Sequence, residues 1–430
     1  MLHNIISYKN VFWQLNVIYK DNINKIMQIT PTKNFTSSNI FSSCFFHRPR
    51  LILCLFSYFF LLLYSCGKDI QSKQEEPFDR TQYLAYSPQN ADKKIDLFFN
   101  DLQTKYGFNG NVLIAKKGKI IYKKSFGWAD YMRRIPLNVN TPFQLASVSK
   151  PLTAVAILML YERGKLKLNQ TVDEFYPKFP YKNITIHYLL THQSGLTNYV
   201  YFSERVWRSK KHPMNNAAAI DLMIKYKPSR YAPEGKIFHY NNTNYMLLGA
   251  IIEKVSRMSY STFMRKNIFQ PAGMYNTQVY TTYENRKFPN NVAIGHDRSW
   301  RFSVSPNYLD GTCGDKGIYS TLDDMFLFDL ALKKGILLKK ETLALAYKPQ
   351  VSIEHIYFSY GYGWRTFSGE HKQIVYHTGW WHGFRNFYMR NLTDDITVVI
   401  LSNLVNGSMN KTDHLFEILE TPIIRKAAYE

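Results

Sequence analysis

Strand-like patterns lie at both ends of this chain, and helical patterns lie between them. Near the start, alternating apolar residues at Asn111–Ala115 and Lys119–Lys123 surround a glycine turn and predict a β-hairpin. Near the end, three β-rich runs predict further strands, at Gln373–His377, Gly383–Arg390 and Ile396–Ser402. This distribution favours an α+β fold, in which one antiparallel sheet is built from both ends of the chain and carries a helical insertion subdomain.

Apolar residues at helical spacing fill much of the remaining sequence. They predict helices at Lys93–Tyr106, Ser147–Arg163, Ala217–Tyr226, Asn244–Ser256 and Leu322–Lys333, and a closing helix from Thr412. The antiparallel sheet should therefore be flanked by helices.

Composition excludes several classes of protein. The chain has 430 residues, of which 45% are apolar and 16% aromatic, so it is too long and too hydrophobic for a disordered tail or a disulfide-stapled miniprotein. Its formal net charge of +22 would attract nucleic acid or anionic lipid. Because the basic residues are scattered and no nucleic-acid motif accompanies them, we interpret this charge as a basic surface and expect no nucleic-acid partner.

An apolar run precedes the region of regular patterns. Leu51–Leu63 follows two arginines, and a helix of this length is about 20 Å long, too short to span a bilayer comfortably. We interpret the run as the apolar core of a signal peptide. It ends in Leu63-Tyr64-Ser65-Cys66, which resembles a bacterial lipoprotein box, so the resemblance implies that Cys66 is lipidated and becomes the new N-terminus.

Three regions follow from this interpretation. Residues 1–65 form the signal peptide region, in which Met27 is an alternative start; residues 66–92 form the lipidated N-terminus and a polar tether; and residues 93–430 form the folded domain. We expect an exported bacterial lipoprotein, anchored in the membrane on the periplasmic or cell-surface side. Cys313 is then the only ordinary thiol of the mature chain, which excludes an intramolecular disulfide.

The candidate nucleophile lies at the start of a predicted helix. Ser147 and Lys150 are three residues apart, a spacing that places the hydroxyl and the ammonium on one helix face. Near a helix start, unpaired N–H groups and the positive end of the dipole stabilise an alkoxide. The bare Ser-x-x-Lys pattern is common, but here it follows a strand-like segment, Phe143–Ala146, and precedes a long apolar helix.

Two further motifs complete a candidate site. Tyr240 and Asn242 lie in a loop before a helix, where a phenol could relay a proton and an amide could orient a substrate. His377-Thr378-Gly379 ends a strand-like run, where an edge strand could pair with an extended acyl substrate and the glycine would allow close approach. A plain turn is the alternative interpretation of this last motif.

The order Ser-x-x-Lys, Tyr-x-Asn and His-Thr-Gly resembles that of the penicillin-recognising serine hydrolases, which include class C β-lactamases, DD-peptidases and related esterases. Intervening stretches resemble the same family: Asn109–Ala115, Ile184–Leu196 and Gly317–Thr321. The resemblance runs from about Lys93 to the C-terminus and implies a β-lactamase/transpeptidase-like domain.

The resemblance also assigns roles. It implies that Ser147 forms an acyl-enzyme, that Lys150 and Tyr240 share the proton transfers, and that Asn242 contacts the substrate amide. The oxyanion would lie between the backbone N–H groups of Ser147 and Trp380. The family acts without a cofactor, and no metal ligands stand at suitable spacing, so we expect neither cofactor nor metal.

The sequence does not identify the substrate class. His377 stands where many β-lactamases carry lysine, and Trp380 stands where DD-peptidases tend to carry serine or threonine, which reduces the expected recognition of β-lactams and of a D-alanine carboxylate. A small-molecule or peptide acyl donor is expected, either a peptide or amide, an ester, or a β-lactam. The alternative is a non-catalytic protein that binds cell-wall fragments.

Overall fold

The computed structural model of the protein describes residues 79–285, 288–298, 300, 302–352, 359–368 and 372–421. The predicted signal peptide and Cys66 lie outside these ranges. Within them, no helix is both long enough and apolar enough to span a membrane.

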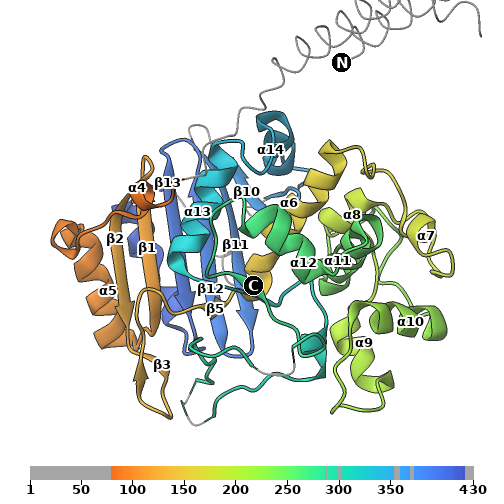
Figure 1. Cartoon of the computed structure of the whole chain (residues 1–430), viewed down its shortest axis with the longest axis horizontal. Coiled ribbons are helices and arrows are strands. Elements are labelled where there is room, and N and C mark those ends of the chain that lie inside the picture. The colour runs from red at the N-terminus through yellow and green to blue at the C-terminus, as the bar shows by residue number, and fades with distance from the viewer. Residues whose placement is uncertain are drawn as a thin grey trace, which may run out of the picture. The chain divides into compact units, whose positions relative to one another are not determined.

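One large antiparallel sheet organises the domain (Figure 1). Its eight strands lie in the order β2-β1-β13-β12-β11-β10-β9-β8, so the first hairpin pairs with the last strand, with Gly110 opposite Ser402. The strands are β1 (Gly110–Lys116), β2 (Lys119–Phe126), β8 (Val351–Ser352), β9 (Ser359–Tyr360), β10 (Arg365–Ser368), β11 (Gln373–Trp381), β12 (Phe384–Asn391) and β13 (Ile396–Ser402). The predicted sheet from both chain ends is confirmed.

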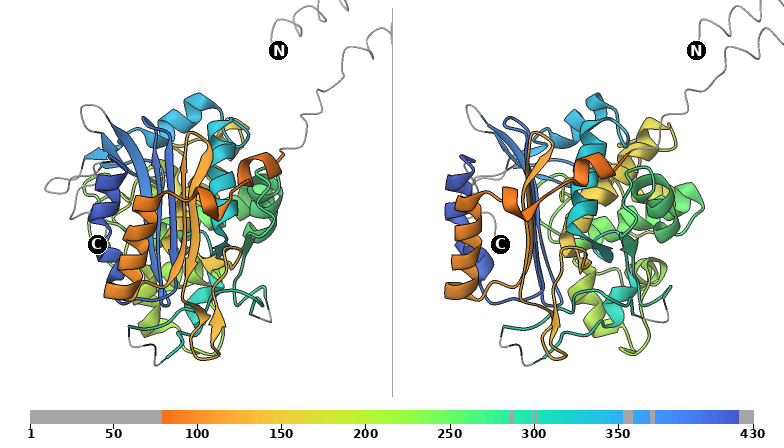
Figure 2. Two further views of the ribbon diagram at one scale, coloured as in Figure 1. Left: turned by 90° about the vertical axis from the view of Figure 1, so that its left-hand side faces the viewer. Right: turned by 60° about the vertical axis from the view of Figure 1, so that its left-hand side comes forward.

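Two hydrophobic cores lie on opposite faces of this sheet. On one face, α5 (Lys93–Tyr106) and α15 (Asp413–Ile418) pack side by side (Figure 2). Side chains alternate along β1, so Val112 points into the core beneath these helices and Leu113 into the larger core on the other face. The central strands are therefore buried on both faces, which makes the sheet a rigid base for the site.

The other face of the sheet is covered by helices, several of which form the predicted insertion (Figure 1). Helix α6 (Ser149–Glu162) is buried on every side from Ser149 to Leu160, which marks it as the central helix of this layer. The other elements of this region are α7 (Val172–Phe175), α8 (Ile186–Leu190), α9 (Tyr199–Val206), α10 (Asn216–Tyr226), α11 (Asn242–Ser256), α12 (Tyr260–Met264), η3 (Arg265–Phe269), α13 (Leu322–Lys333) and α14 (Lys340–Tyr347). The α+β class with a helical insertion is confirmed.

Short elements connect the two regions. The strands β3 (Trp128–Asp130) and β4 (Ile135–Pro136) form a small hairpin, and β5 (Phe143–Gln144), β7 (Ile318–Ser320) and β6 (Gln278–Val279) form a three-stranded sheet. Four 3-10 turns complete the description: η1 (Pro88–Asn90), η2 (Ala146–Val148), η4 (Tyr308–Gly311) and η5 (Ser408–Lys411).

The folded part begins earlier than the predicted tether allows. Within the range 66–92, residues 81–84 form the short helix α4 (Thr81–Leu84). Arg80 lies 3.8 Å from the buried carboxylate of Asp324, and the Asp92 N–H donates to the carbonyl of Ile121. Residues 79–92 therefore pack on the domain, because these polar contacts hold the backbone against it.

Candidate active site

Ser147 lies between a strand and a helix. Strand β5 pairs with β7, and the Leu145 N–H donates to Ile318 O at 2.8 Å, which fixes the chain just before the serine. Ala146 then adopts a φ of 52°, a left-handed conformation that is unfavourable for a residue with a Cβ. This sharp turn places Ser147 in the 3-10 turn η2, directly ahead of α6.

Lys150 is held by three hydrogen bonds. Its side chain is fully buried, and its Nζ lies 2.9 Å from Ser147 Oγ, 2.9 Å from Asn242 Oδ1 and 3.0 Å from Asp315 O. None of these partners is a carboxylate, so the amine is oriented by neutral acceptors. The predicted contact between the serine and the lysine is present at hydrogen-bonding distance.

Tyr240 and Asn242 come to the same place from the start of α11. The ring of Tyr240 lies 5.0 Å from Lys150 Nζ. Between them in sequence, Asn241 caps α11, because its side chain accepts from the Thr243 N–H. The structure therefore brings Ser147, Lys150, Tyr240 and Asn242 together, as the motif spacing predicts.

Behind Tyr240 lies His192, a residue of the stretch Ile184–Leu196 to which the sequence motifs assign no role. The buried His192 ring packs 4.4 Å from the Tyr240 ring, measured between centroids. Its Nδ1 accepts from the Asn241 N–H at 3.1 Å, which leaves the proton on Nε2. Burial lowers the pKa of His192 well below its ordinary value, as do the charges of Lys150 and its neighbours, so the ring is neutral and acts as an acceptor.

His377 does not line the site cavity. The side chain is fully buried, with Nε2 3.1 Å from Tyr360 Oη and Nδ1 2.7 Å from the Thr378 carbonyl oxygen. Burial lowers its pKa well below the ordinary value, and the charges of Arg365 and Lys150 lower it further, so the ring is neutral. The motif predicts His377 at the substrate together with Thr378 and Gly379, but β11 turns its side chain into the core, so it does not border the cavity.

The remaining residues of the motif border the cavity. Gly379 packs so tightly that a Cβ there would lie 2.3 Å from Leu145 O, which brings β11 against the segment before Ser147. Next to it, the Trp380 side chain is 65% exposed and lies over Arg385, with 5.2 Å from the guanidinium carbon to the ring centroid.

A cavity of about 430 Å³ opens beside Ser147. It is lined by Ser147, Asn198, Tyr201, Tyr231, His239, Tyr240, Asn242, Arg365, Thr378, Gly379, Trp380 and Arg385. Among these lining residues two are arginines and none is an aspartate or glutamate. The cavity therefore favours an uncharged or anionic occupant over a cation.

Sequence reasoning missed Arg365 and Arg385. Arg365 lies on β10, opposite Tyr376 of β11, a pairing that no sequence motif predicts.

The described residues do not indicate a metal site. Among them, no three His, Cys, Asp or Glu side chains are placed to hold an ion.

This fold, with a serine and a lysine at hydrogen-bonding distance beside a tyrosine and a glycine of strand β11, defines the class of penicillin-recognising serine hydrolases. The sequence matches the Beta-lactamase family over residues 95–421, and the chain belongs to that family.

Relatives agree with this placement. A penicillin-binding protein of Bacillus subtilis (strain 168) is 36% identical over 327 residues, which cover 73% of this chain and 72% of that protein. The crystal structure of a penicillin-binding protein from Bacillus halodurans matches with a TM-score of 0.65 and 28% identity, and covers 74% of this chain and 98% of that one. An octameric penicillin-binding protein homologue from Pyrococcus abyssi matches with a TM-score of 0.66 and 25% identity, over 76% and 77% of the two chains.

Proposed function

We propose that the protein is a serine hydrolase that cleaves an amide or ester through an acyl-enzyme. The observation that carries this proposal is the 2.9 Å contact between Ser147 Oγ and the buried Lys150 Nζ at the edge of a cavity. A serine hydroxyl becomes nucleophilic when a base within hydrogen-bonding reach can take its proton.

The proposed reaction has two halves. Ser147 Oγ attacks the substrate carbonyl carbon, and its proton passes to the neutral amine of Lys150. Lys150 then returns that proton, through Tyr240, to the leaving nitrogen or oxygen as the bond to the leaving group breaks. Water then attacks the acyl-enzyme, gives a proton back to Ser147 Oγ and releases the acid. The backbone N–H groups of Ser147 and Trp380 would hold the oxyanion, each contributing roughly 3 kcal/mol to the transition state.

Covalent labelling tests this proposal. A fluorophosphonate or a fluorescent penicillin should add one adduct to the wild-type protein, detected by intact mass and mapped to Ser147. Ser147→Ala should abolish the adduct, and Lys150→Met should slow it by roughly 10²-fold to 10⁴-fold. Absence of any adduct, together with no ester hydrolysis, would contradict the proposal.

The candidate substrate classes, which are amides, esters and β-lactams, differ in the leaving group that the enzyme must release. We propose an amide or peptide substrate first, since relatives carry the name penicillin-binding protein. Comparing D-amino-acid amides, p-nitrophenyl esters and a chromogenic cephalosporin separates the peptidase or amidase, the esterase and the β-lactamase. The highest kcat/KM identifies the class.

A non-catalytic binder of cell-wall fragments is the second candidate. The cavity beside Ser147 would serve such a protein as well as it serves an enzyme. In that case muropeptide affinity would be the same for wild type and Ser147→Ala, and neither protein would show turnover. A binder gains nothing from the amine of Lys150, which is why we place this candidate second.

We also propose that the mature protein is exported and anchored through Cys66. The support is the apolar run 51–63 followed by that cysteine. Metabolic labelling with a palmitate analogue should mark the wild type and the Cys313→Ser control in the membrane fraction. Cys66→Ser should lose the label, and equal labelling of this variant would contradict the anchor.

A further inference from the structure

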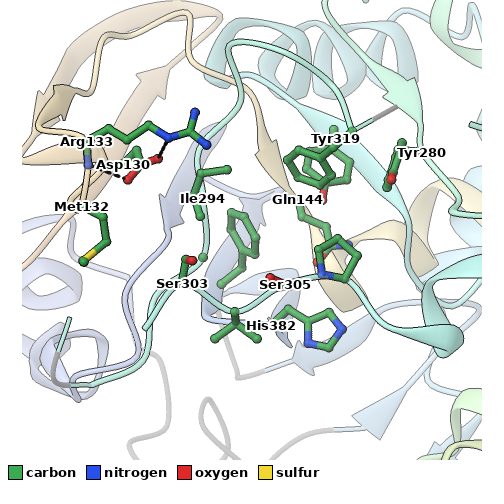
Figure 3. A pocket seen from close by; sticks show the side chains of 15 residues that line it. Asp130, Met132, Arg133, Gln144, Tyr280, Ile294, Ser303, Ser305, Tyr319 and His382 are labelled. Carbon is green, nitrogen blue, oxygen red and sulfur yellow. Dashed lines mark hydrogen bonds and ion pairs between the residues drawn. The ribbon is translucent and has the colours of Figure 1, made fainter. Parts of the chain in front are cut away.

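A second cavity lies apart from the candidate active site. It also measures about 430 Å³ and shares no lining residue with the cavity at Ser147. Its floor is β5 and β7, and one wall is the segment 303–306 (Figure 3). A volume of this size holds a molecule of one or two rings.

Aromatic side chains make up much of the apolar lining. Tyr280, Phe288 and Tyr319 pack edge to face with centroids 5.2 to 6.0 Å apart, and Phe384 lies 6.4 Å from Tyr319. The first three belong to a small hydrophobic cluster that is separate from both main cores. Such walls favour a flat, apolar ligand.

Three polar groups border this cavity without a protein partner. Gln144, Tyr280 and Tyr319 are only 3%, 6% and 2% exposed. Among the described residues the Gln144 Oε1 is buried without a hydrogen-bond partner, while the two hydroxyls make no hydrogen bond and are open to the cavity. Burial raises the pKa of both phenols, and the nearby Asp310 charge raises it further, so the hydroxyls remain donors at neutral pH. A buried acceptor such as Gln144 Oε1 is costly unless something satisfies it.

We propose that this cavity is a binding site for a small planar molecule that carries an uncharged amide on an aromatic frame. An amide offers an N–H that the Gln144 Oε1 can accept and a carbonyl oxygen to which the Tyr280 and Tyr319 hydroxyls can donate. The aromatic walls take the frame. The rim of the cavity carries one negative and one positive side chain, Asp130 and Arg133, which form an ion pair at 3.3 Å. The rim therefore does not favour a ligand with a net charge.

Two probes of equal shape test the proposal. We use 2-naphthamide and 2-acetonaphthone, in which a methyl group replaces the NH₂, and titrate each by calorimetry. The amide should bind one to one and about tenfold more tightly than the ketone, because only the amide donates to Gln144. Equal affinities, or no binding of either probe, would overturn the proposal.

Matched variants locate the binding. Gln144→Met keeps the side-chain volume and should remove the preference for the amide, whereas Gln373→Met on an exposed strand end should keep it. Tyr280→Phe and Tyr319→Phe should weaken both probes equally, since both carry the carbonyl. Ser147→Phe narrows the other cavity and should leave the affinity for 2-naphthamide unchanged.

The same variants also show whether the probes bind in this cavity or at another place on the protein. A preference that survives in Gln144→Met, or binding that disappears in Ser147→Phe, would overturn the assignment to this cavity. Thermal unfolding of every variant identifies those that fail to fold. Because the phenylalanine variants remove only an unpartnered hydroxyl, they should fold and keep the test valid if Gln144→Met does not.

Discussion

A Cβ atom placed on Gly379 would lie 2.3 Å from the carbonyl oxygen of Leu145. The strand β11 and the segment leading into Ser147 are thus in backbone contact, with no space for a side chain. We expect Gly379→Ala to push these two segments apart and to slow fluorophosphonate labelling by about 100-fold, because a displacement of about 1 Å misplaces the reacting groups. Gly118→Asn, in an open hairpin turn, is the control. Labelling of Gly379→Ala within threefold of the wild type would contradict this role.

His192 should affect turnover without touching the substrate. His192→Phe keeps the ring against Tyr240 but removes the acceptor for the Asn241 N–H, so the loop that presents Tyr240 should shift. We expect kcat to fall roughly 10-fold to 100-fold with KM changed less than threefold, measured on the best ester or amide substrate. His187→Phe, which removes a contact with Tyr362 elsewhere in this region, should stay within twofold. A change confined to KM would show that His192 affects binding instead.

Asp324 should reduce stability at neutral pH. Burial raises the pKa of Asp324 to about 6, against an unfolded value near 3.8. Stability therefore falls as pH rises from about 4 to about 6 and stays low above that, since the unfolded chain releases the proton first. Asp324→Asn should raise the free energy of unfolding by about 1 to 3 kcal/mol at pH 7.5 and by little at pH 4, measured by urea titration.

The neighbouring carboxylate supplies the control for this substitution. Asp323 pairs with Lys123 at 3.0 Å near the surface. Asp323→Asn should lower stability at pH 7.5 by at most about 1 kcal/mol, the opposite sign. If both variants lost stability equally, the buried charge of Asp324 would not be a cost to the fold.

The neutral state of His377 makes stability fall in acid. Its folded pKa lies well below 6.5, so the unfolded chain binds a proton first as pH drops through about 6.5. This histidine should cost about 1.4 kcal/mol of stability for each pH unit below that point. We expect His377→Gln to flatten the dependence between pH 6.5 and 5, whereas the exposed control His414→Gln should not. Parallel curves for His377→Gln and the wild type would contradict a buried neutral ring.

The Trp380 side chain should contribute to substrate binding but not to the chemical step. Its indole is largely exposed at the mouth of the cavity, while its proposed oxyanion role uses the backbone N–H, which every substitution but proline keeps. Trp380→Ala should raise KM severalfold and leave kcat within about threefold, measured by steady-state kinetics. A loss of kcat equal to that of Gly379→Ala would show that the indole positions the strand.

Periodicity and motif order predicted much of this molecule. The helix Leu322–Lys333 and the strand Ile396–Ser402 have the predicted ends, because a capping threonine precedes the helix and a turn precedes the strand. The short strands β8 to β10 went unpredicted, since runs of two to four residues carry no measurable period. The contact between Ser147 and Lys150 was predictable from their spacing, although Ser147 lies in the 3-10 turn η2 directly ahead of α6 and not in the helix itself.

The orientation of a strand is harder to predict from sequence. Side chains alternate along β11, so His377 and Gly379 share the face that packs against the segment before Ser147, while Thr378 and Trp380 face outward. The motif His-Thr-Gly gives no sign of which face meets the cavity. Arg365 was missed for a related reason, since it reaches the cavity only through the pairing of β10 with β11.

The pairing of β1 with β13 means that the large sheet cannot be completed before Ile396–Ser402 has been synthesised. Until Ile396–Ser402 leaves the ribosome, the opening hairpin and β12 each present a bare edge of unpaired N–H and C=O groups, which invites association between growing chains. Contacts this distant in sequence also close slowly. Chaperones that hold nascent chains open should therefore matter more for this protein than for one whose strands pair in order.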